Sequence, residues 1–210
     1  MIAVLDYGIG NLRSAEKALV HLGGAAELVS DPERAATADA VVLPGVGAFG
    51  ACAAALRASG LDEPCRLAVA RGLPFLGICV GFQLLFEASE EDPGAAGLGL
   101  LPGVVRRIPG RVKLPQMQWN RLDRPAGRPS AMLEGLGERP WFYFVHSYAP
   151  EQVAANEAAV VGTCDYGGPV VAAVEEGSLW GVQFHPEKSG RSGLSLLERF
   201  LAAAGAAAAK

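Results

Sequence analysis

Short apolar runs alternate with helical patterns through residues 1–90, and this alternation constrains the fold more than any other feature. The runs lie at 2–5, 26–29, 40–44 and 73–78. They are predicted to be buried strands, because parallel strands covered on both faces lose the alternation of apolar and polar residues. Helices are predicted between them, from a stripe formed by Leu12, Ala15, Leu19 and Leu22 and around 50–58 and 62–70. This order predicts an α/β protein with an open, mainly parallel sheet and helices on both faces.

The second half of the chain is predicted to be rich in strands. They are expected at 103–108, 142–148, 159–164, 169–175 and 178–184, joined by short connections that contain Gly and Pro. These strands form either an extension of the same sheet or a small antiparallel flap. A last helix is predicted at about 192–203, and the alanine-rich tail 204–210 is expected to fray. No linker divides the chain, so residues 1–210 are expected to form a single domain.

Composition narrows the class of protein. The chain has 210 residues, 50% of them hydrophobic and 19% charged, which is typical of a folded globular protein. A net charge of −4 and the lack of a Lys/Arg block predict no binding to nucleic acid or to a membrane surface. The start MIAVLDYGIG is not expected to be a signal peptide, and no apolar run reaches the length of a membrane span, so a cytoplasmic protein is expected.

The four cysteines argue against a metal centre. They stand at positions 52, 65, 79 and 164, without a CxxC pair and without the regular spacing of a zinc site. In a cytoplasmic chain such cysteines are expected to be free thiols. The sequence therefore predicts no metal and no cofactor.

The stretch DYGIGN, residues 6–11, follows a predicted strand and precedes a predicted helix. Gly8 and Gly10 match the first two glycines of a dinucleotide-binding fingerprint, but Arg13 stands where the third glycine is needed. The simpler interpretation is a loop of flexible backbone with Asn11 as the N-cap of the helix.

The stretch GICVG, residues 77–81, places a cysteine between two glycines where a strand gives way to a helix. This is the pattern of a nucleophile elbow, in which a sharp turn exposes the nucleophile at the carboxyl edge of a sheet. The positive end of the following helix would favour a thiolate. Cys79 is therefore predicted to be a nucleophile, and the alternative is an inert cysteine in the core.

A nucleophilic cysteine needs a base, and the chain offers His21, His146 and His185. His185 and Glu187 stand two residues apart after an apolar strand, and positions i and i+2 of an extended chain share a face. A carboxylate could thus orient the imidazole, which predicts the triad Cys79, His185 and Glu187. The alternative is an ordinary turn at a strand end. For the oxyanion, the backbone amides of Val46 or Gly47 in PGVG (44–47) and of Val80 are the predicted donors.

These residues resemble the class I (triad) glutamine amidotransferases. GICVGFQ is similar to the family's nucleophile signature and HPE to its base-and-acid pair. DYGIGN followed by LRS, PGVGAFG, QWN (118–120), FVHSY (144–148) and HPEKS (185–189) resemble the branch that supplies ammonia for imidazole glycerol phosphate in histidine biosynthesis. Phe82 and Gln118 depart from the family pattern, where methionine and glycine are common.

The resemblance implies a flavodoxin-like sheet and a glutaminase. Cys79 would attack the side-chain amide of glutamine, backbone amides would hold the oxyanion, and His185 would pass a proton to the leaving ammonia. Water would then hydrolyse the thioester to glutamate. The glutamine pocket implied in this way consists of Gly45, Gly47, Gln83, His146, Ser147 and Tyr148.

The resemblance also implies a partner. A separate (β/α)8-barrel cyclase subunit would dock over the active-site face, form a hetero-dimer with the chain and use the ammonia. It would convert a phosphoribulosyl carboxamide ribonucleotide into imidazole glycerol phosphate and an aminoimidazole carboxamide ribonucleotide. The implied docking residues are Asn11, Trp119, Asn120 and Lys188.

Three alternatives stay open on the sequence. A neighbouring glutaminase of the same class would share the elbow and HPE, but it is not expected to carry DYGIGN, QWN and HPEKS together. A cysteine hydrolase or peptidase on a similar sheet would be expected to place its histidine close behind the cysteine. A catalytically silent binding module is the third alternative, and the intact Cys, His and Glu argue against it.

Overall fold

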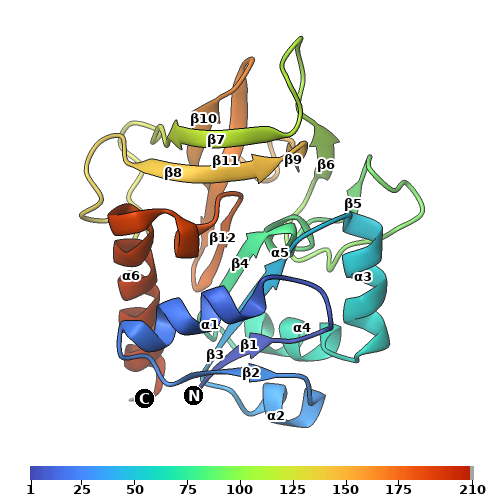
Figure 1. Ribbon diagram of the computed structural model, residues 1–210, viewed down its shortest axis with the longest axis vertical. Coiled ribbons are helices and arrows are strands. Elements are labelled where there is room, and N and C mark those ends of the chain that lie inside the picture. Colours follow the sequence, from blue (N-terminus) through green and yellow to red (C-terminus); the bar gives the residue numbers. More distant parts are fainter. Residues whose placement is uncertain (209–210) are drawn as a thin grey trace.

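The computed structural model describes residues 1–208, and seven strands form its central sheet in the order β10-β11-β12-β4-β3-β1-β2 (Figure 1). Their bounds are Ile2–Leu5 (β1), Ala26–Val29 (β2), Ala40–Gly45 (β3), Phe75–Cys79 (β4), Val160–Asp165 (β10), Pro169–Glu176 (β11) and Leu179–Val182 (β12). Strands β2, β1, β3, β4 and β12 are parallel, and β11 and β10 continue the sheet antiparallel. The predicted mainly parallel sheet is therefore confirmed.

Helices cover both faces of this sheet. They are α1 (Leu12–His21), α2 (Pro32–Ala36), α3 (Phe49–Ala58), α4 (Asp62–Ala70), α5 (Val80–Gln83) and α6 (Gly190–Ala208), with a 3₁₀ turn, η1, at Pro186–Lys188. The strand order reverses after β2, so right-handed crossovers place α1 on one face and α2 to α4 on the other. Helix α6 contacts α1 and shares its face. The carboxyl ends of β3 and β4 meet at one edge, where the candidate site lies.

Both alternatives for the second half of the chain occur. Strands β10 and β11 extend the central sheet, and the remaining strands form two small sheets. One contains β5 (Ala88–Ser89), β6 (Val104–Arg107) and β9 (Tyr148–Pro150), and the other is the antiparallel pair of β7 (Gln116–Arg121) and β8 (Trp141–His146). The single strand predicted at 142–148 is wrong, because the chain leaves β8 at Ser147 and enters β9 in a different sheet.

Helix α6 is longer than predicted. It begins at Gly190 and continues to Ala208, through most of the tail that was expected to fray. Ala204 is buried, and alanine has the highest helix propensity of all residues, so the alanine-rich sequence continues the helix instead of ending it. Residues 209–210 lie outside the described residues.

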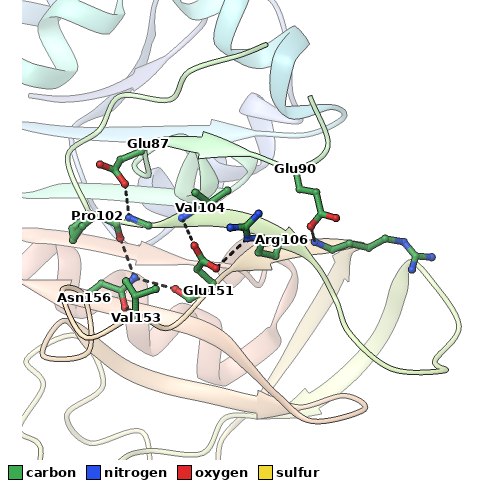
Figure 2. Close-up of polar contacts among 10 residues, drawn as sticks. Glu87, Glu90, Pro102, Val104, Arg106, Glu151, Val153 and Asn156 are labelled. Carbon is green, nitrogen blue, oxygen red and sulfur yellow. Dashed lines mark hydrogen bonds and ion pairs between the residues drawn. The ribbon is translucent and has the colours of Figure 1, made fainter. Parts of the chain in front are cut away.

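Acidic side chains hold the small β5-β6-β9 sheet together (Figure 2). Glu151, which follows β9, accepts hydrogen bonds from the backbone N–H of Val104 at 3.2 Å and from Nε of Arg106 at 3.0 Å. Glu87 accepts from the N–H of Gly103 at 2.9 Å. The bonds of Glu151 fix β6 against β9, and β9 begins at Tyr148, which itself lines the candidate site.

Candidate active site

Cys79 occupies a strained turn between β4 and α5. It is the last residue of β4, and its φ of 57° is the only positive φ of a non-glycine residue in the described part of the chain. Backbone strain of this kind costs on the order of 1–3 kcal/mol and persists only where the surrounding structure enforces it. The turn directs the side chain of Cys79 into a cavity at the edge of the sheet.

The two flanking glycines allow α5 to pack directly on the strands. A Cβ at Gly81 would lie 1.9 Å from the carbonyl oxygen of Leu43, and one at Gly77 would lie 2.9 Å from Cα of Phe82. Any side chain at either position would displace backbone. Helix α5 has only four residues, so the favourable effect of a helix dipole on a thiolate, which was expected from the sequence, is small here.

His185 and Glu187 form a buried pair beside Cys79. Nδ1 of His185 lies 2.8 Å from Oε1 of Glu187, and the two side chains are 5% and 4% exposed. Strand β12 ends at Val182, and Glu187 belongs to η1, so the pair meets across a 3₁₀ turn and not by the strand alternation that was predicted. Pro186 begins that turn with a fixed φ suited to it.

The pKa values of the two histidines of the site are shifted in opposite directions. Burial acts to lower the pKa of His185, but hydrogen bonds and charge interactions with Cys79 and Glu187 outweigh it and raise the pKa to about 9. Burial lowers the pKa of His146 to about 4. Nδ1 of this neutral His146 lies 2.8 Å from the carbonyl oxygen of Tyr148, which can only accept, so the ring proton is on Nδ1.

A cavity of about 300 Å³ opens above Cys79. Of the residues predicted to bind substrate, Gly47, Gln83, His146, Ser147 and Tyr148 line it, together with Cys79 and His185. Gly45 is not among its lining residues. A Cβ at Gly45 would lie 2.7 Å from the backbone nitrogen of Gly81, so this glycine serves the close contact between β3 and the elbow. The cavity size falls in the range of small-molecule sites.

Two predicted oxyanion donors are free at the edge of this cavity. Val46 and Gly47 both line it, and their backbone N–H groups donate no hydrogen bond to any residue that the structure describes. Val80, the third predicted donor, also lines the cavity as the first residue of α5. Backbone N–H groups without a partner beside a nucleophile are suited to hold a developing oxyanion.

A chain of buried amides reaches the sulfur of Cys79. Nε2 of Gln83 donates to the carbonyl oxygen of Tyr148 at 2.9 Å and to Oε1 of Gln183 at 3.0 Å. Nε2 of Gln183 in turn donates to Sγ of Cys79 at 3.8 Å. The sequence interpretation missed Gln183, although it stands two positions before His185 in a strand-like stretch, which is a usable signal.

Glu91 is a second residue that the sequence interpretation missed. Its carboxylate lines the cavity and accepts a hydrogen bond from the N–H of Phe49 at 2.9 Å, at the start of α3. In the sequence it lies in the charged run SEED (89–92), which is typical of a solvent-exposed loop. Only the fold shows that this loop passes over the cavity.

The four residues implied for docking differ in their exposure and in their hydrogen bonds. Asn11 is exposed at the N-cap of α1 and makes no side-chain capping bond, and Lys188 is exposed at the rim of the cavity. Trp119 is 48% exposed on β7. Asn120 is half-buried, and its Nδ2 donates to the carbonyl oxygen of Asp165 at 2.9 Å. His21, the remaining histidine, is exposed at the end of α1.

Among residues 1–208 there is no cluster of three or more Cys, His, Asp or Glu side chains arranged to hold a metal ion. All four cysteines are free and buried. No helix in the same range combines the length and the apolar character needed to cross a membrane.

Comparison with known proteins agrees with this geometry. The family model for class I glutamine amidotransferases matches residues 3–204, so the chain belongs to this family. A solved structure of a glutamine amidotransferase superposes with a TM-score of 0.75 over 98% of this chain and 100% of that one, at 24% identity. PurLQS from Thermotoga maritima gives a TM-score of 0.71 over 96% and 97%, at 23% identity. At these identities the likeness concerns the fold alone.

Within the family, similar curated proteins include imidazole glycerol phosphate synthase subunits HisH. The protein of that name from Moorella thermoacetica is 48% identical over 95% of this chain and 93% of its own length. The one from Methanothermobacter thermautotrophicus is 48% identical over 96% and 98%. Relatives named as subunits imply that this chain also has a partner subunit.

Proposed function

We propose that the chain is the glutaminase subunit of imidazole glycerol phosphate synthase. The observation that carries the proposal is the constellation of Cys79 on its strained turn, the buried His185–Glu187 pair and the free backbone N–H groups at one cavity. The near full-length relatives named HisH support the choice of this synthase over neighbouring glutaminases.

The residues at the cavity would carry out the hydrolysis in two stages. Sγ of Cys79 attacks the side-chain carbonyl carbon of glutamine, and the proton that the thiol gives up resides on His185. The N–H groups of Gly47 or Val46 and of Val80 hold the oxyanion. His185 then protonates the amide nitrogen as the C–N bond breaks and ammonia leaves. Water attacks the thioester, gives its proton to His185 and releases glutamate, and the proton returns to the sulfur.

Glu187 would act through His185. Its Oε1, 2.8 Å from Nδ1, keeps that nitrogen protonated and leaves Nε2 for the sulfur and the leaving group. Neutral His146 is not suited to hold the transferred proton, because its pKa is about 4 and its Nδ1 is engaged with Tyr148. It is better placed to shape the glutamine pocket together with Ser147 and Tyr148.

Glu91 would recognise the α-ammonium group of glutamine. A free amino acid brings one positive and one negative charge into the cavity, and a buried charge needs a partner. Glu91 supplies the carboxylate that lines the cavity, and its bond from Phe49 holds it in place. We therefore add Glu91 to the predicted substrate residues Gln83, Ser147 and Tyr148.

The partner that fits this function is a (β/α)8-barrel cyclase subunit in a hetero-dimer. The surface that would receive it is the β7–β8 outer face, which we define as Met117, Trp119, Arg121, Trp141, Tyr143 and Val145. Alternation along paired strands places these side chains on one side. Met117, Trp119 and Trp141 are 62%, 48% and 47% exposed. Val145 also lines the cavity, so this face adjoins the site of ammonia release.

We also propose a compartment and a domain organisation for the chain. The chain acts in the cytoplasm, because its substrate and the partner's ribonucleotide are metabolites of biosynthesis. Residues 1–210 act as one domain, because one hydrophobic core includes side chains from β1 through α6.

The experiment that tests the assignment combines the chain with a candidate barrel cyclase and follows imidazole glycerol phosphate. With glutamine as the nitrogen source, product should form only when both proteins are present. With ammonia in place of glutamine, the cyclase alone should suffice. If glutamine turnover is strong but does not depend on the cyclase or its ligand, the chain is a glutaminase of a different pathway.

A further inference from the structure

The segment 44–47, which begins in β3 and carries the predicted oxyanion donors Val46 and Gly47, is held by two buried side chains that the mechanism does not use. The hydroxyl of Tyr7 donates to the carbonyl oxygen of Pro44 at 2.6 Å, and the thiol of Cys52 donates to the carbonyl oxygen of Val46 at 3.3 Å. Tyr7 follows β1, and Cys52 lies on α3. Two elements that contribute nothing to the triad therefore fix alternate carbonyls of residues 44–47.

The bond from Cys52 sets the direction of one peptide group. The carbonyl of Val46 and the N–H of Gly47 belong to the same planar trans peptide and point in opposite directions. Because the carbonyl points to Cys52, the N–H of Gly47 points away from α3. Cys52 is fully buried and does not line the cavity above Cys79, whereas Gly47 does. The orientation that Cys52 holds is thus the one in which Gly47 can donate into the cavity.

Register along β3 supports the same orientation. The N–H of Val41 donates to the carbonyl oxygen of Pro74, just before β4, so alternate residues 41, 43 and 45 face β4 and Pro44 directs its carbonyl to the β1 side, where the hydroxyl of Tyr7 donates to it. Continued alternation directs the carbonyl of Val46 to the same side. Gly45 pairs with Cys79 of β4. The N–H of Gly47 therefore lies on the side of the strand that β4 and Cys79 occupy.

The thiol of Cys52 is suited to be a permanent donor. Burial raises the pKa of Cys52 by more than the nearby hydroxyl of Tyr7 lowers it, so the sulfur keeps its proton at neutral pH. Burial likewise raises the pKa of Tyr7, whose hydroxyl stays protonated. Neither the thiol of Cys52 nor the hydroxyl of Tyr7 therefore changes its charge near neutral pH.

We propose that Cys52 is a positioning residue of the glutaminase, which holds the Val46–Gly47 peptide with its N–H directed toward the oxyanion on Cys79. This inference rests on the proposed function. The peptide group between Val46 and Gly47 has room to rotate, because Gly47 has a φ of +94° and a Cβ there would meet nothing within 4 Å. Without the bond from Cys52, the peptide populates both orientations, and only one of them can donate to the oxyanion.

The test compares steady-state glutaminase kinetics of Cys52→Ala, Cys52→Val and Cys52→Ser in the complex with the cyclase and its ligand. An oxyanion donor that is removed outright costs about 100- to 1,000-fold in kcat, so one that is only released should cost roughly 3- to 10-fold. We expect this loss in the Ala and Val variants with KM within about twofold of the wild type. Cys52→Ser restores a donor and should recover most of kcat.

Cys65→Ala is the matched control, because Cys65 on α4 is also fully buried and does not line the cavity. It should leave kcat unchanged. The inference is wrong if Cys52→Ala and Cys65→Ala have equal kcat, if Ser fails to exceed Ala, or if the loss falls on KM. A wild type without glutaminase activity in this assay would instead reject the proposed function, so the two failures are distinguishable.

Discussion

His185 links the charge of the active site to the stability of the fold. Its imidazole has a folded pKa of about 9, against about 6.5 for an unperturbed histidine. The native state therefore binds a proton more tightly than the unfolded chain does. The contribution of this proton to stability is fully present below about pH 6.5 and is lost as the pH rises through about 9.

The corresponding prediction compares the wild type with His185→Gln in urea melts at pH 6.5 and pH 9. The wild type should lose on the order of 3 kcal/mol of unfolding free energy more than the variant over this interval, because the variant lacks the titrating group. Equal losses in the two proteins would show that His185 is not the group with the raised pKa.

A second prediction at this scale concerns Gln183. Gln183→Met keeps the approximate volume and removes the N–H that donates to Sγ of Cys79. Because the attacking form of Cys79 is the thiolate and a hydrogen bond to a charged group contributes about 1.5–3 kcal/mol, kcat for glutamine hydrolysis should fall roughly tenfold or more. Gln116→Met is the matched control, since Nε2 of buried Gln116 lies at the same 3.8 Å from Sγ of Cys164. If both variants lose kcat equally, packing and not the bond to Cys79 explains the effect.

Sequence reasoning at the residue scale grouped those candidate residues that are close together in the chain. Gly77, Cys79 and Gly81 stand within one turn, and His185 and Glu187 within another, so spacing alone brings each group together. Glu91 and Gln183 were missed because their partners, Phe49 and Cys79, come from distant segments. Cys52 is close to Val46 in the chain, but its bond depends on how α3 packs, which no local pattern records. The contact between Gln183 and Cys79 joins residues 104 positions apart, so the sequence signal for Gln183 is limited to its place two positions before His185.

At the scale of elements, the turn between β4 and α5 depends on how closely the helix approaches β3. Gly81→Ala would place a methyl group 1.9 Å from the backbone of Leu43. We expect it to lower the unfolding free energy by at least about 2 kcal/mol, as overpacking against rigid backbone does.

Gly205→Ala supplies the control for this prediction. Gly205 lies in α6, and a Cβ there meets no atom within 4 Å, so the change should stabilise the protein slightly through helix propensity. Chemical denaturation of both variants measures the difference. A Gly81→Ala protein as stable as the wild type would mean that α5 does not need its close approach to β3.

Sequence patterns located the elements of the central sheet well and those of the small sheets poorly. The strands β1, β3 and β4 are continuous apolar runs buried on both faces, which the sequence shows directly. β7 reads QMQWNR, and most of it is exposed, so it lacks the apolar signal of a strand. Its position depends on pairing with β8, a tertiary contact that local propensity does not record.

For the whole molecule, β7 and β8 lie together at one end, above the central strands (Figure 1). The cavity lies beside them, because Val145 and His146 of β8 line it together with Cys79 at the end of β4. Trp119→Ala should weaken the complex with the cyclase about tenfold or more, since exposed tryptophans are frequent anchors of interfaces. The melting temperature of the free chain should change little, because Trp119 is 48% exposed. Titration calorimetry or partner-dependent glutaminase activity measures the affinity.

Val20→Ala is the control for this surface. Val20 is 51% exposed on α1, outside the β7–β8 outer face. The complex should tolerate its loss. An affinity that falls with Val20→Ala but not with Trp119→Ala would place the partner on a different side of the molecule.

The central claim is that Cys79 is the nucleophile of a glutaminase, and the rate of glutamate release from glutamine tests it most directly. The assay contains the chain, the barrel cyclase and its ribonucleotide ligand, and it compares the wild type with Cys79→Ala and Cys164→Ala. Cys164 is a buried free cysteine outside the cavity and serves as the matched control. The account predicts release by the wild type and Cys164→Ala and none above background by Cys79→Ala. Release that persists in Cys79→Ala would contradict it.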